Sequence, residues 1–358
     1  MPRRKLLFYM HALEGGGAER VVALLASGFA RRGFEVILAV DAEARQNTPY
    51  LSADVRTVIL GRGHARTTFR LARLLSRERP DISISALGAS NLKHALACLA
   101  AGRTSRAVLT NHGFRESEPQ RLSRLGNGMT PLTSRLCART VCVSAVLRRH
   151  VVETWACDPA RTVVIPNPVA IDEAVPARSE AELVSRLPMV LAAGRLIPLK
   201  GFMTLLRAFA DVRSSDARLV ILGEGPQRAE MEAEIRRLGL GERVQLPGYV
   251  DNPWAYFRAA RCFALSSVAE TFGNVIVEAL AHGLPVVATR CGGAEEVLGD
   301  DLGQLVQVGD EAALTEALGG ALARPGDPSP RVRRARAFSV DVALDQYEWL
   351  ITEIIAQI

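Results

Sequence analysis

The fold of this chain is decided by one stretch, Glu270-Thr271-Phe272-Gly273-Asn274-Val275-Ile276-Val277-Glu278, and by the Ala279-Leu280-Ala281-His282-Gly283-Leu284-Pro285-Val286-Val287-Ala288 that follows it. The pattern predicts an apolar helix that begins at the Gly-Asn turn and ends at His282-Gly283, since a glycine commonly ends a helix. The apolar run after that glycine predicts a buried strand. Glu270 then lies on a loop at the helix N-terminus, where backbone N–H groups and the helix dipole favour a phosphate.

The two carboxylates of this stretch suit a sugar nucleotide. Glu278 lies about one turn into the predicted helix, within reach of a ligand bound beside Glu270. A carboxylate can accept hydrogen bonds from two neighbouring hydroxyls, so one glutamate would hold the sugar and the other the ribose diol. The alternative is an amphipathic helix with two solvated glutamates, which a bare pair at this spacing would usually indicate.

Short apolar runs alternate with amphipathic stretches through the rest of the chain. The 358 residues suffice for two domains, each with its own core. The βαβ rhythm predicts the α/β class, with two doubly wound domains, an interdomain cleft and ligands at the carboxyl ends of the strands. The expected strands are 6–10, 35–40, 82–86, 107–110, 140–143, 163–165, 189–193, 219–222, 244–246, 262–265 and 285–289, and the expected first-half helices are 18–32, 66–77 and 92–101.

Two segments have a weaker pattern. The stretch 114–134 is polar and interrupted by proline and glycine, which predicts a loop or loose helices next to a site. Residues 170–186 read as the linker between the domains. The predicted domains are therefore 1–170 and 171–340, followed by a C-terminal segment, 341–358.

The net charge of +6 hides an asymmetry between the two halves. Residues 1–175 hold 25 Lys and Arg against 14 Asp and Glu, whereas residues 176–358 hold 19 against 24. A basic half favours an anionic membrane surface or an acidic acceptor as partner. Nucleic acid is not expected, because the chain resembles no nucleic-acid module and aromatic residues, 5% of the total, do not interleave with the basic ones.

Composition also predicts a cytoplasmic protein without a metal site. No run of about 18 uncharged apolar residues occurs, and the short apolar run after Arg3-Arg4-Lys5 reads as a first strand rather than a signal peptide. The six cysteines show no C-x-x-C pairing and lie mostly in apolar contexts, as in a reduced cytosolic protein.

A glycine-rich turn, Leu13-Glu14-Gly15-Gly16-Gly17, follows the first predicted strand and opens the first helix. Its glycines let the backbone approach a ligand closely, and the helix N-terminus favours anions. The same turn could be a Rossmann dinucleotide loop with Asp41 as the acidic residue after the second strand, although the spacing is not G-x-G-x-x-G.

A second loop, Gly194-Arg195-Leu196-Ile197-Pro198-Leu199-Lys200-Gly201, follows the first strand of the second half. Arg195 and Lys200 would grip a pyrophosphate from one side. Ordinary surface charge is the alternative, but the chain has only three lysines, which favours a point-charge role here. His112 follows the strand 107–110 and precedes a glycine, which places it at the edge of the predicted cleft; a lone histidine is otherwise usually structural.

Together these motifs resemble those of the GT-B retaining glycosyltransferases of family 4. The likeness lies in the E-x7-E segment with its Phe-Gly-Asn insert, the G-R-x-x-x-x-K-G loop, the G-x-G-P turn that begins at Gly223 and the first glycine loop, and it extends over nearly the whole chain. Ala170 departs from it, because many members have Asp there. The resemblance implies a GT-B fold of two Rossmann-like domains, of which 1–170 binds the acceptor and 171–340 the nucleotide-sugar, and a helix in 341–358 that crosses back to the first domain.

The resemblance also implies a role for each matching residue. It implies transfer with retention of the anomeric configuration, without a cofactor and, as no D-x-D motif is present, without a metal. Catalytic roles are implied for His112, Arg195, Lys200 and Glu270. The residues implied to bind the donor are Gly16, Gly17, Gly223, Glu224, Arg243, Val250, Thr271, Phe272, Gly273, Asn274, Val275 and Glu278, with Tyr249 as a further candidate near the base.

The expected donor is a UDP-sugar, with GDP-mannose second, and the expected acceptor is a sugar. One alternative is a GT-B relative that acts as a sugar-nucleotide epimerase or a phosphorylase. Another, from a different class, is a non-catalytic ligand-binding protein with two Rossmann lobes.

A row of arginines predicts where the protein works. Arg62, Arg66, Arg70, Arg73 and Arg77 recur at spacings of three and four, which stacks them along one side of a helix. A solvated helix that packs its leucines on the sheet is the alternative. The row and the basic first half predict a peripheral enzyme on the anionic inner face of the membrane, with a lipid-linked acceptor for a surface polysaccharide or glycoconjugate.

Overall fold

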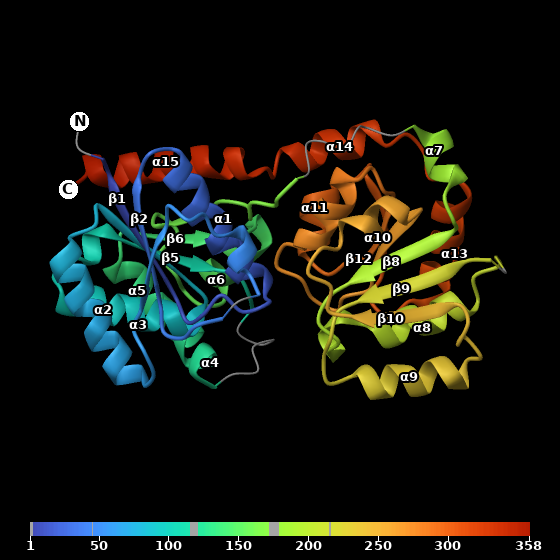
Figure 1. Cartoon of the computed structure of the whole chain (residues 1–358), viewed down its shortest axis with the longest axis horizontal. Helices are drawn as coiled ribbons and strands as arrows, with labels where there is room; N and C mark the ends of the chain where they lie inside the picture. The colour runs from blue at the N-terminus through green and yellow to red at the C-terminus, as the bar shows by residue number, and fades with distance from the viewer. Residues whose placement is uncertain (1–2, 45, 115–120, 172–178, 215) are drawn as a thin grey trace. The chain divides into compact units, whose positions relative to one another are not determined.

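The computed structural model describes residues 3–44, 46–114, 121–171, 179–214 and 216–358. The chain forms two compact units, the first made of Met1–Pro168 and Ser339–Ile358 and the second of Val169–Phe338 (Figure 1). Each unit has a parallel sheet covered by helices on both faces, so the predicted α/β class with two doubly wound domains is confirmed.

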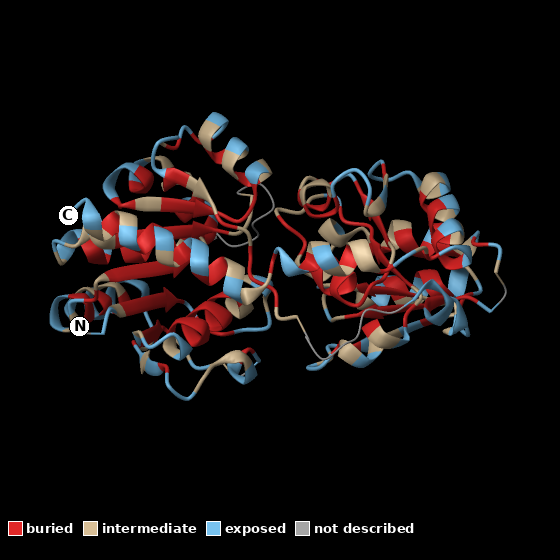
Figure 2. Ribbon diagram, turned by 90° about the horizontal axis from the view of Figure 1, so that it is seen from above, coloured by how far each residue is buried: buried red, intermediate tan, exposed pale blue. Residues whose placement is uncertain are grey.

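The first unit contains a seven-stranded sheet in the order β3-β2-β1-β4-β5-β6-β7, with every pairing parallel. Its inner strands read as continuous apolar runs because both faces are covered, and Figure 2 shows them as buried. The strands are β1 (Lys5–Met10), β2 (Glu35–Val40), β3 (Arg56–Ile59), β4 (Ile82–Ala86), β5 (Ala107–Asn111), β6 (Arg139–Cys142) and β7 (Thr162–Val164).

Alternate residues of β1 belong to the two cores of this unit. Leu6, Phe8 and Met10 pack with helices α1 and α15 on one face, and Leu7 and Tyr9 pack with α2 and α3 on the other. The helices are α1 (Gly17–Arg31), α2 (His64–Glu78), α3 (Gly88–Ala100), α4 (Arg121–Gly128), α5 (Thr130–Leu136), α6 (Ala145–Glu153) and α15 (Val340–Ala356), with 3₁₀ turns η1 (Thr48–Tyr50) and η2 (Thr104–Arg106).

The second unit repeats the design with a six-stranded parallel sheet in the order β10-β9-β8-β11-β12-β13. Its strands are β8 (Met189–Ala193), β9 (Arg218–Leu222), β10 (Val244–Gly248), β11 (Cys262–Leu265), β12 (Val286–Thr289) and β13 (Gly303–Val306). Its helices are α7 (Glu180–Ser185), α8 (Phe202–Ala210), α9 (Arg228–Arg237), α10 (Trp254–Ala259), α11 (Asn274–Ala281), α12 (Gly293–Leu298), α13 (Glu311–Ala323) and α14 (Ser329–Arg336), with the 3₁₀ turn η3 (Pro198–Lys200).

The eleven predicted strands and three predicted helices all exist, with ends that shift by a few residues. Sequence patterns missed the edge strands β3 and β13, because each has only two consecutive apolar residues; β3 is mostly exposed, and β13 has a single buried residue. Part of the segment 114–134, residues 115–120, and part of the linker 170–186, residues 172–178, lie outside the described residues. The described remainder of the first segment forms α4 and α5, and the end of the second forms α7, so neither is a plain loop.

Each sheet has one point at which the strand order reverses. In the first unit β1 stands between β2 and β4, and in the second β8 stands between β9 and β11. Open parallel sheets bind their ligands outside the carboxyl ends of the strands at such a switch point. The loops after β1 and β4, and those after β8 and β11, are therefore the places where function is expected.

Candidate active site

An ion pair joins the two loops that follow β8 and β11 in the second unit. The Lys200 ammonium contacts Oε1 of Glu270, and the Ser267 hydroxyl donates to the same oxygen at 2.9 Å. The lysine ends η3 after β8, and the glutamate lies on the loop between β11 and α11. Two residues predicted from separate motifs thus meet at the switch point of the second sheet.

Backbone contacts hold these loops together. The Ser266 hydroxyl donates to the carbonyl oxygen of Lys200 at 2.9 Å, and the Val268 N–H donates to that of Leu199 at 2.8 Å. Gly201 has φ 62°, and a Cβ at that position would lie 2.0 Å from the Ser266 carbonyl oxygen. Only glycine fits this crossing, so the glycine next to Lys200 fixes where the lysine stands.

The loops after β8 and β9 also lie against each other. The Leu196 N–H donates to the Glu224 carbonyl oxygen at 2.9 Å. Gly223 has φ 133°, and a Cβ there would lie 2.0 Å from the Gly194 carbonyl oxygen. Arg195 follows the carboxyl end of β8 in the same loop and is exposed.

The Glu224 carboxylate has a partner within its own segment. Arg228 binds it at 2.7 Å, and hydrogen bonds from that guanidinium lower the pKa of Glu224. A ligand that uses this carboxylate would therefore compete with Arg228. The backbone of the turn, rather than the Glu224 side chain, is the better candidate for donor contact.

The helix predicted at the phosphate site is present as α11. Gly273 caps α11 with φ 91°, and Asn274 and Val275, the first two helical residues, are partly exposed, as is Thr271 before them. The Phe272 ring instead serves the core, because it is 1% exposed and packs edge-on against Phe338 at 5.3 Å between ring centres. The Phe272 side chain is thus removed from the predicted ligand contacts.

Glu278 is buried on the second turn of α11, at 4% exposure, and the His282 ring lies 2.8 Å from its carbonyl oxygen. Beyond β10, Tyr249 and Val250 follow the carboxyl end of the strand, on the same edge of the sheet as the lysine and glutamate pair. They stay candidates for contact with the base.

Arg243 does not join this group. It precedes β10 at the amino end of the sheet, where its guanidinium stacks on Phe209 at 4.8 Å and donates to the Ser214 carbonyl oxygen at 3.2 Å. Parallel strands place their amino ends on the edge opposite the ligand site. The prediction that Arg243 binds the donor is corrected for this reason.

In the first unit the predicted residues also follow strand ends. Gly16 caps α1 and Gly17 begins it, and the buried Asn47 amide donates to the Gly16 carbonyl oxygen at 3.2 Å. His112 follows β5, and its Nε2 lies 2.9 Å from the Thr110 hydroxyl. Burial lowers the pKa of His112 to about 4, so its imidazole is neutral near pH 7.

Sequence reasoning missed Ser266 and Ser267, which connect the two loops. A signal was present, because two hydroxyl residues directly follow the apolar run 262–265. Across the residues that the structure describes, no three His, Cys, Asp or Glu side chains gather as a metal-binding group.

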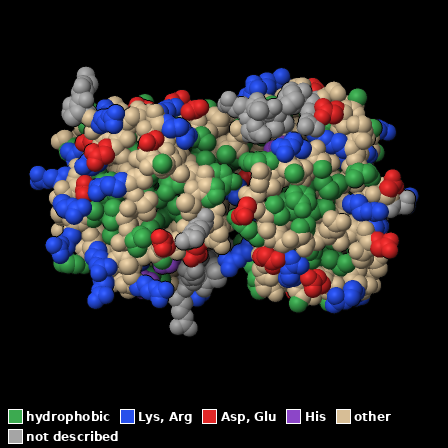
Figure 3. Space-filling view, viewed as in Figure 1, with side chains coloured by type: hydrophobic (Ala, Val, Ile, Leu, Met, Phe, Trp, Pro, Cys, Tyr) green, Lys and Arg blue, Asp and Glu red, His purple; other side chains and the backbone are tan. Residues whose placement is uncertain are grey.

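The arginine row lies on α2 with one exception. Arg66, Arg70, Arg73 and Arg77 are exposed on the helix, whereas Arg62 precedes it, because α2 begins only after Gly63. The prediction that all five share one helix face is therefore corrected for Arg62. Figure 3 shows Lys and Arg side chains gathered over the side of the first unit that carries α2. No helix in the described part of the chain has the length and apolar character needed to cross a membrane.

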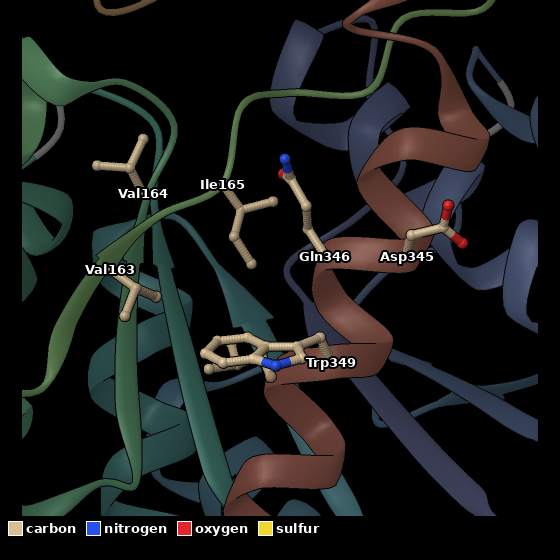
Figure 4. Close-up of a pocket in the computed structure, with 7 residues that line it drawn as sticks. Val163, Val164, Ile165, Asp345, Gln346 and Trp349 are labelled. Carbon is tan, nitrogen blue, oxygen red and sulfur yellow. The ribbon is translucent and has the colours of Figure 1, made fainter.

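A separate pocket of about 400 Å³ lies between β7 and α15 in the first unit. The Trp349 ring lies across it from Val163 and Val164, and Asp345 and Gln346 stand at its side (Figure 4). None of the predicted site residues lines it.

Two family models match consecutive parts of the chain. "Glycosyltransferase Family 4" covers residues 15–173, and "Glycosyl transferases group 1" covers residues 187–324. The two models thus divide the chain near the boundary between the first and second sheets.

Curated relatives are similar over parts of their length. N-acetylgalactosamine-N,N'-diacetylbacillosaminyl-diphospho-undecaprenol 4-alpha-N-acetylgalactosaminyltransferase of Campylobacter jejuni is 33% identical over 207 residues, which cover 56% of this chain and 56% of that protein. Lipopolysaccharide core biosynthesis glycosyltransferase LpsD of Rhizobium meliloti is 29% identical over 245 residues, which cover 64% of this chain and 69% of that protein. The chain thus spans little more than half the length of the Campylobacter relative.

Among solved structures, Anabaena HepE in complex with UDP and glucose matches with a TM-score of 0.84 and 20% identity, over 98% of this chain and 100% of that one. At this identity the likeness shows the fold, and it covers both units.

Proposed function

Because this chain belongs to the GT-B glycosyltransferases of family 4, we propose that it transfers a sugar from a nucleotide-sugar to a sugar acceptor with retention of the anomeric configuration. A UDP-sugar is the first choice of donor and GDP-mannose the second. The observation that carries the proposal is the contact between Lys200 and Glu270 at the switch point of the second sheet. The complex of HepE with UDP and glucose supports the choice of nucleotide.

The charges at this edge support a role in leaving-group stabilisation. A lysine has three N–H donors, and Lys200 directs one to Glu270, so two are left for the donor phosphates. Arg195 and the N-terminus of α11 add positive charge on the same edge. Cations placed where charge develops stabilise the transition state, and they suit a departing diphosphate.

The same residues suggest the course of the reaction. The predicted motifs contain no obvious enzymic nucleophile, so attack on the front face of the sugar is proposed, with the departing phosphate oxygen taking the acceptor proton. The enzyme then contributes positioning and charge stabilisation. Glu270 would hold the sugar hydroxyls, and neutral His112 would hydrogen-bond the sugar without adding charge.

No metal is required in this proposal, since side-chain cations and a helix N-terminus would meet the diphosphate. The test is turnover of the UDP-sugar in EDTA, with and without added Mg²⁺. Equal rates are expected. A rate that EDTA abolishes and Mg²⁺ restores would contradict the metal-independent form of the mechanism.

The acceptor is proposed to be lipid-linked, and the protein to work at the inner face of the membrane. The name of the Campylobacter relative, which specifies a diphospho-undecaprenol acceptor, supports this choice. So does the surface formed by α2, α3 and α5, neighbouring helices of the first unit. It carries the four arginines of α2 together with exposed apolar side chains, namely Phe69, Leu96, Leu99, Leu132 and Leu136.

A surface that carries exposed arginines on α2 and exposed apolar side chains on the neighbouring helices suits an anionic bilayer. Each basic residue near such a surface contributes about 1 kcal/mol, and apolar side chains add burial in the interface. The test is flotation with anionic and neutral liposomes. Wild-type protein is expected to float with anionic vesicles at low salt. The double variant Arg66→Glu, Arg73→Glu is expected to remain unbound at the bottom of the gradient.

A matched control carries Arg236→Glu and Arg333→Glu, which reverse two exposed charges in the second unit. It should float like wild type. Failure of wild-type protein to bind anionic vesicles at low salt would favour a soluble acceptor.

The donor site is tested first by thermal shift with UDP, GDP and ADP. A ligand at 100 times its Kd stabilises the folded state by about 2.7 kcal/mol, so the preferred nucleotide will raise the Tm most. The absence of a shift with all three nucleotides would contradict the proposed donor site. An acceptor-free assay separates the epimerase alternative, because an epimerase would convert the UDP-sugar without transfer.

A further inference from the structure

A buried carboxylate at the carboxyl edge of the first sheet holds three polar side chains that the donor site does not use. Asp41 directly follows β2 and is 3% exposed. The Lys93 ammonium forms an ion pair with its Oδ2, the Tyr9 hydroxyl donates to Oδ1 at 3.0 Å, and His11 Nδ1 lies 3.2 Å from Oδ2.

This cluster stands at the switch point of the first sheet. His11 directly follows β1, and Lys93 lies on α3, the helix that follows β4. The second unit places its Lys200 and Glu270 pair at the equivalent point of its own sheet, after β8 and β11. The position is therefore the one where an open parallel sheet binds its ligand.

The chain accepts strain at the same place. Leu87, between β4 and α3, has φ 75° and ψ 146°, a backbone conformation that residues with a Cβ rarely adopt. Leu87 directly precedes α3, the helix on which Lys93 lies. Strain of this kind is retained where the surrounding structure requires it, often beside a binding site.

A purely structural cluster would account for Asp41 and Lys93 but not for His11. The lysine already balances the carboxylate charge, and both side chains are buried, at 3% and 8% exposure. The His11 side chain is 59% exposed, so it fills no space in the core. The contact with Asp41 instead orients the His11 ring.

The contact fixes which ring nitrogen faces outward as an acceptor. An ionised carboxylate only accepts hydrogen bonds, so His11 Nδ1 must carry the proton that it donates to Asp41. In the neutral imidazole Nε2 then keeps its lone pair and can accept a hydrogen bond. The site thus offers one oriented hydrogen-bond acceptor, Nε2 of His11, next to a buried ion pair at the carboxyl edge of the first sheet.

We propose that His11 is an acceptor-binding residue, which accepts a hydrogen bond through Nε2 from a hydroxyl of the acceptor sugar. Asp41 orients the ring, and Lys93 keeps Asp41 ionised. The inference rests on the proposed function and deepens it, because it assigns the acceptor to a named side chain of the first unit.

The charges around His11 give the role a pH signature. The hydrogen bond that His11 donates to Asp41 raises the pKa of His11, the Glu14 carboxylate acts in the same direction, and Lys93 opposes them. A protonated ring cannot accept from a hydroxyl, so kcat/KM for the acceptor should fall as pH drops through a pKa above 6.5. A residue that only supports the fold would not produce this limb.

The test compares His11→Ala, His11→Gln and His64→Gln in the full chain. The probe is farnesyl-diphosphate-linked N-acetylglucosamine in detergent, with a UDP-sugar as donor. His11→Ala should lower kcat/KM for the probe about tenfold, the value of one lost hydrogen bond, and leave the Kd for UDP unchanged. In His11→Gln the amide oxygen can replace Nε2, so most of the rate should return and the acidic limb should disappear.

His64→Gln is the matched control, because His64 is exposed at the start of α2. It should retain the rate and the acidic limb of wild type. An unchanged kcat/KM in His11→Ala would overturn the proposal. A weaker Kd for UDP in that variant would also overturn it, since the residue would then act on the donor.

A measurement without acceptor tests the same geometry. Long-range ¹H–¹⁵N NMR, with the His11 signals assigned from their loss in His11→Gln, reports the tautomer of the ring. A proton on Nδ1 and a pKa above 6.5 are expected; a neutral ring protonated on Nε2 would overturn the proposal.

The experiment distinguishes a wrong choice of acceptor from a wrong role for His11. A wild-type protein that turns over its UDP-sugar but leaves the probe unmodified would contradict the lipid-linked acceptor and not the role of His11. That role is then read from the Nε2 chemical shift as methyl hexosides and methyl N-acetylhexosaminides are added. A shift change supports it, and no change with any glycoside overturns it.

Discussion

Replacing Lys200 with alanine separates the structural from the chemical role of the cation paired with Glu270. The two side chains are 21% and 13% exposed, so the pair is neither fully buried nor on the open surface. Removing one partner of a buried pair costs about 3–5 kcal/mol, and an exposed pair contributes less than about 1 kcal/mol. We therefore expect Lys200→Ala to lower the free energy of unfolding by about 1–3 kcal/mol, with the fold retained.

The effect on turnover should be larger than the effect on stability. If the Lys200 ammonium neutralises charge on the departing diphosphate, its loss resembles the loss of one oxyanion-stabilising donor, about 10²–10³ in kcat. The KM for the UDP-sugar should change less, because the charge that the lysine meets develops only as the diphosphate departs. The assay is kcat and KM for the UDP-sugar, with urea unfolding of the same preparations.

Lys5→Ala provides the matched control. Lys5 has a similar exposure, 24%, and pairs with Glu35 at 2.9 Å, but it lies at the amino end of β1, away from the ligand edge. Its removal should cost about 1 kcal/mol or less and leave kcat unchanged. A folded Lys200→Ala protein with kcat within threefold of wild type would refute the role of Lys200, as would equal losses in the two variants.

Three further predictions follow from single positions. Gly201→Ala should lower kcat and should lower stability by more than the about 1–2 kcal/mol that a left-handed backbone costs, because the new Cβ would meet the Ser266 carbonyl oxygen at 2.0 Å. The control Gly239→Ala, at φ 66° with nothing within 4 Å, should show the backbone cost alone. Equal losses of stability in urea unfolding of the two variants would exclude the loop crossing as the cause. Glu278→Ala should weaken UDP binding about tenfold or more by calorimetry, since hydrogen bonds to a charged group contribute about 1.5–3 kcal/mol, and an unchanged Kd would exclude the ribose role. Acid should destabilise the fold below pH 6.5, the usual pKa of histidine in the unfolded chain, because burial lowers the pKa of His94 to about 3 in the folded chain. Between these two pKa values the unfolded chain binds more protons, and each pH unit lowers the free energy of unfolding by about 1.4 kcal/mol. A free energy of unfolding that is equal at pH 7 and pH 5 would contradict the burial of this ring.

Local patterns in the sequence were enough to predict the two parallel sheets and most of the candidate donor site. Buried strands of a parallel sheet are continuous apolar runs, so 262–265 and 285–289 are legible without their neighbours. The Gly273 cap and the helix after it are equally local, because a helix start depends on residues within one turn. This is why the loop that bears Glu270 could be predicted as a phosphate site.

Sequence distance sets the limit of that reasoning. Lys200 and Glu270 lie 70 positions apart and each belongs to a motif of its own, so their ion pair appears only when β8 and β11 become neighbours in the sheet. The prediction for Arg243 was wrong for a different reason. The predicted strand 244–246 runs between Arg243 and Tyr249, and it therefore places the two residues at opposite edges of the sheet.

The fold alone assembled the cluster around Asp41. His11, Asp41 and Lys93 come from three segments with no common motif, and they meet because parallel pairing aligns the ends of β1 and β2 while α3 returns over the sheet. A spacing pattern records only neighbours along the chain. Which charges become partners, and which ring nitrogen faces outward, is decided by the register of strands far apart in sequence.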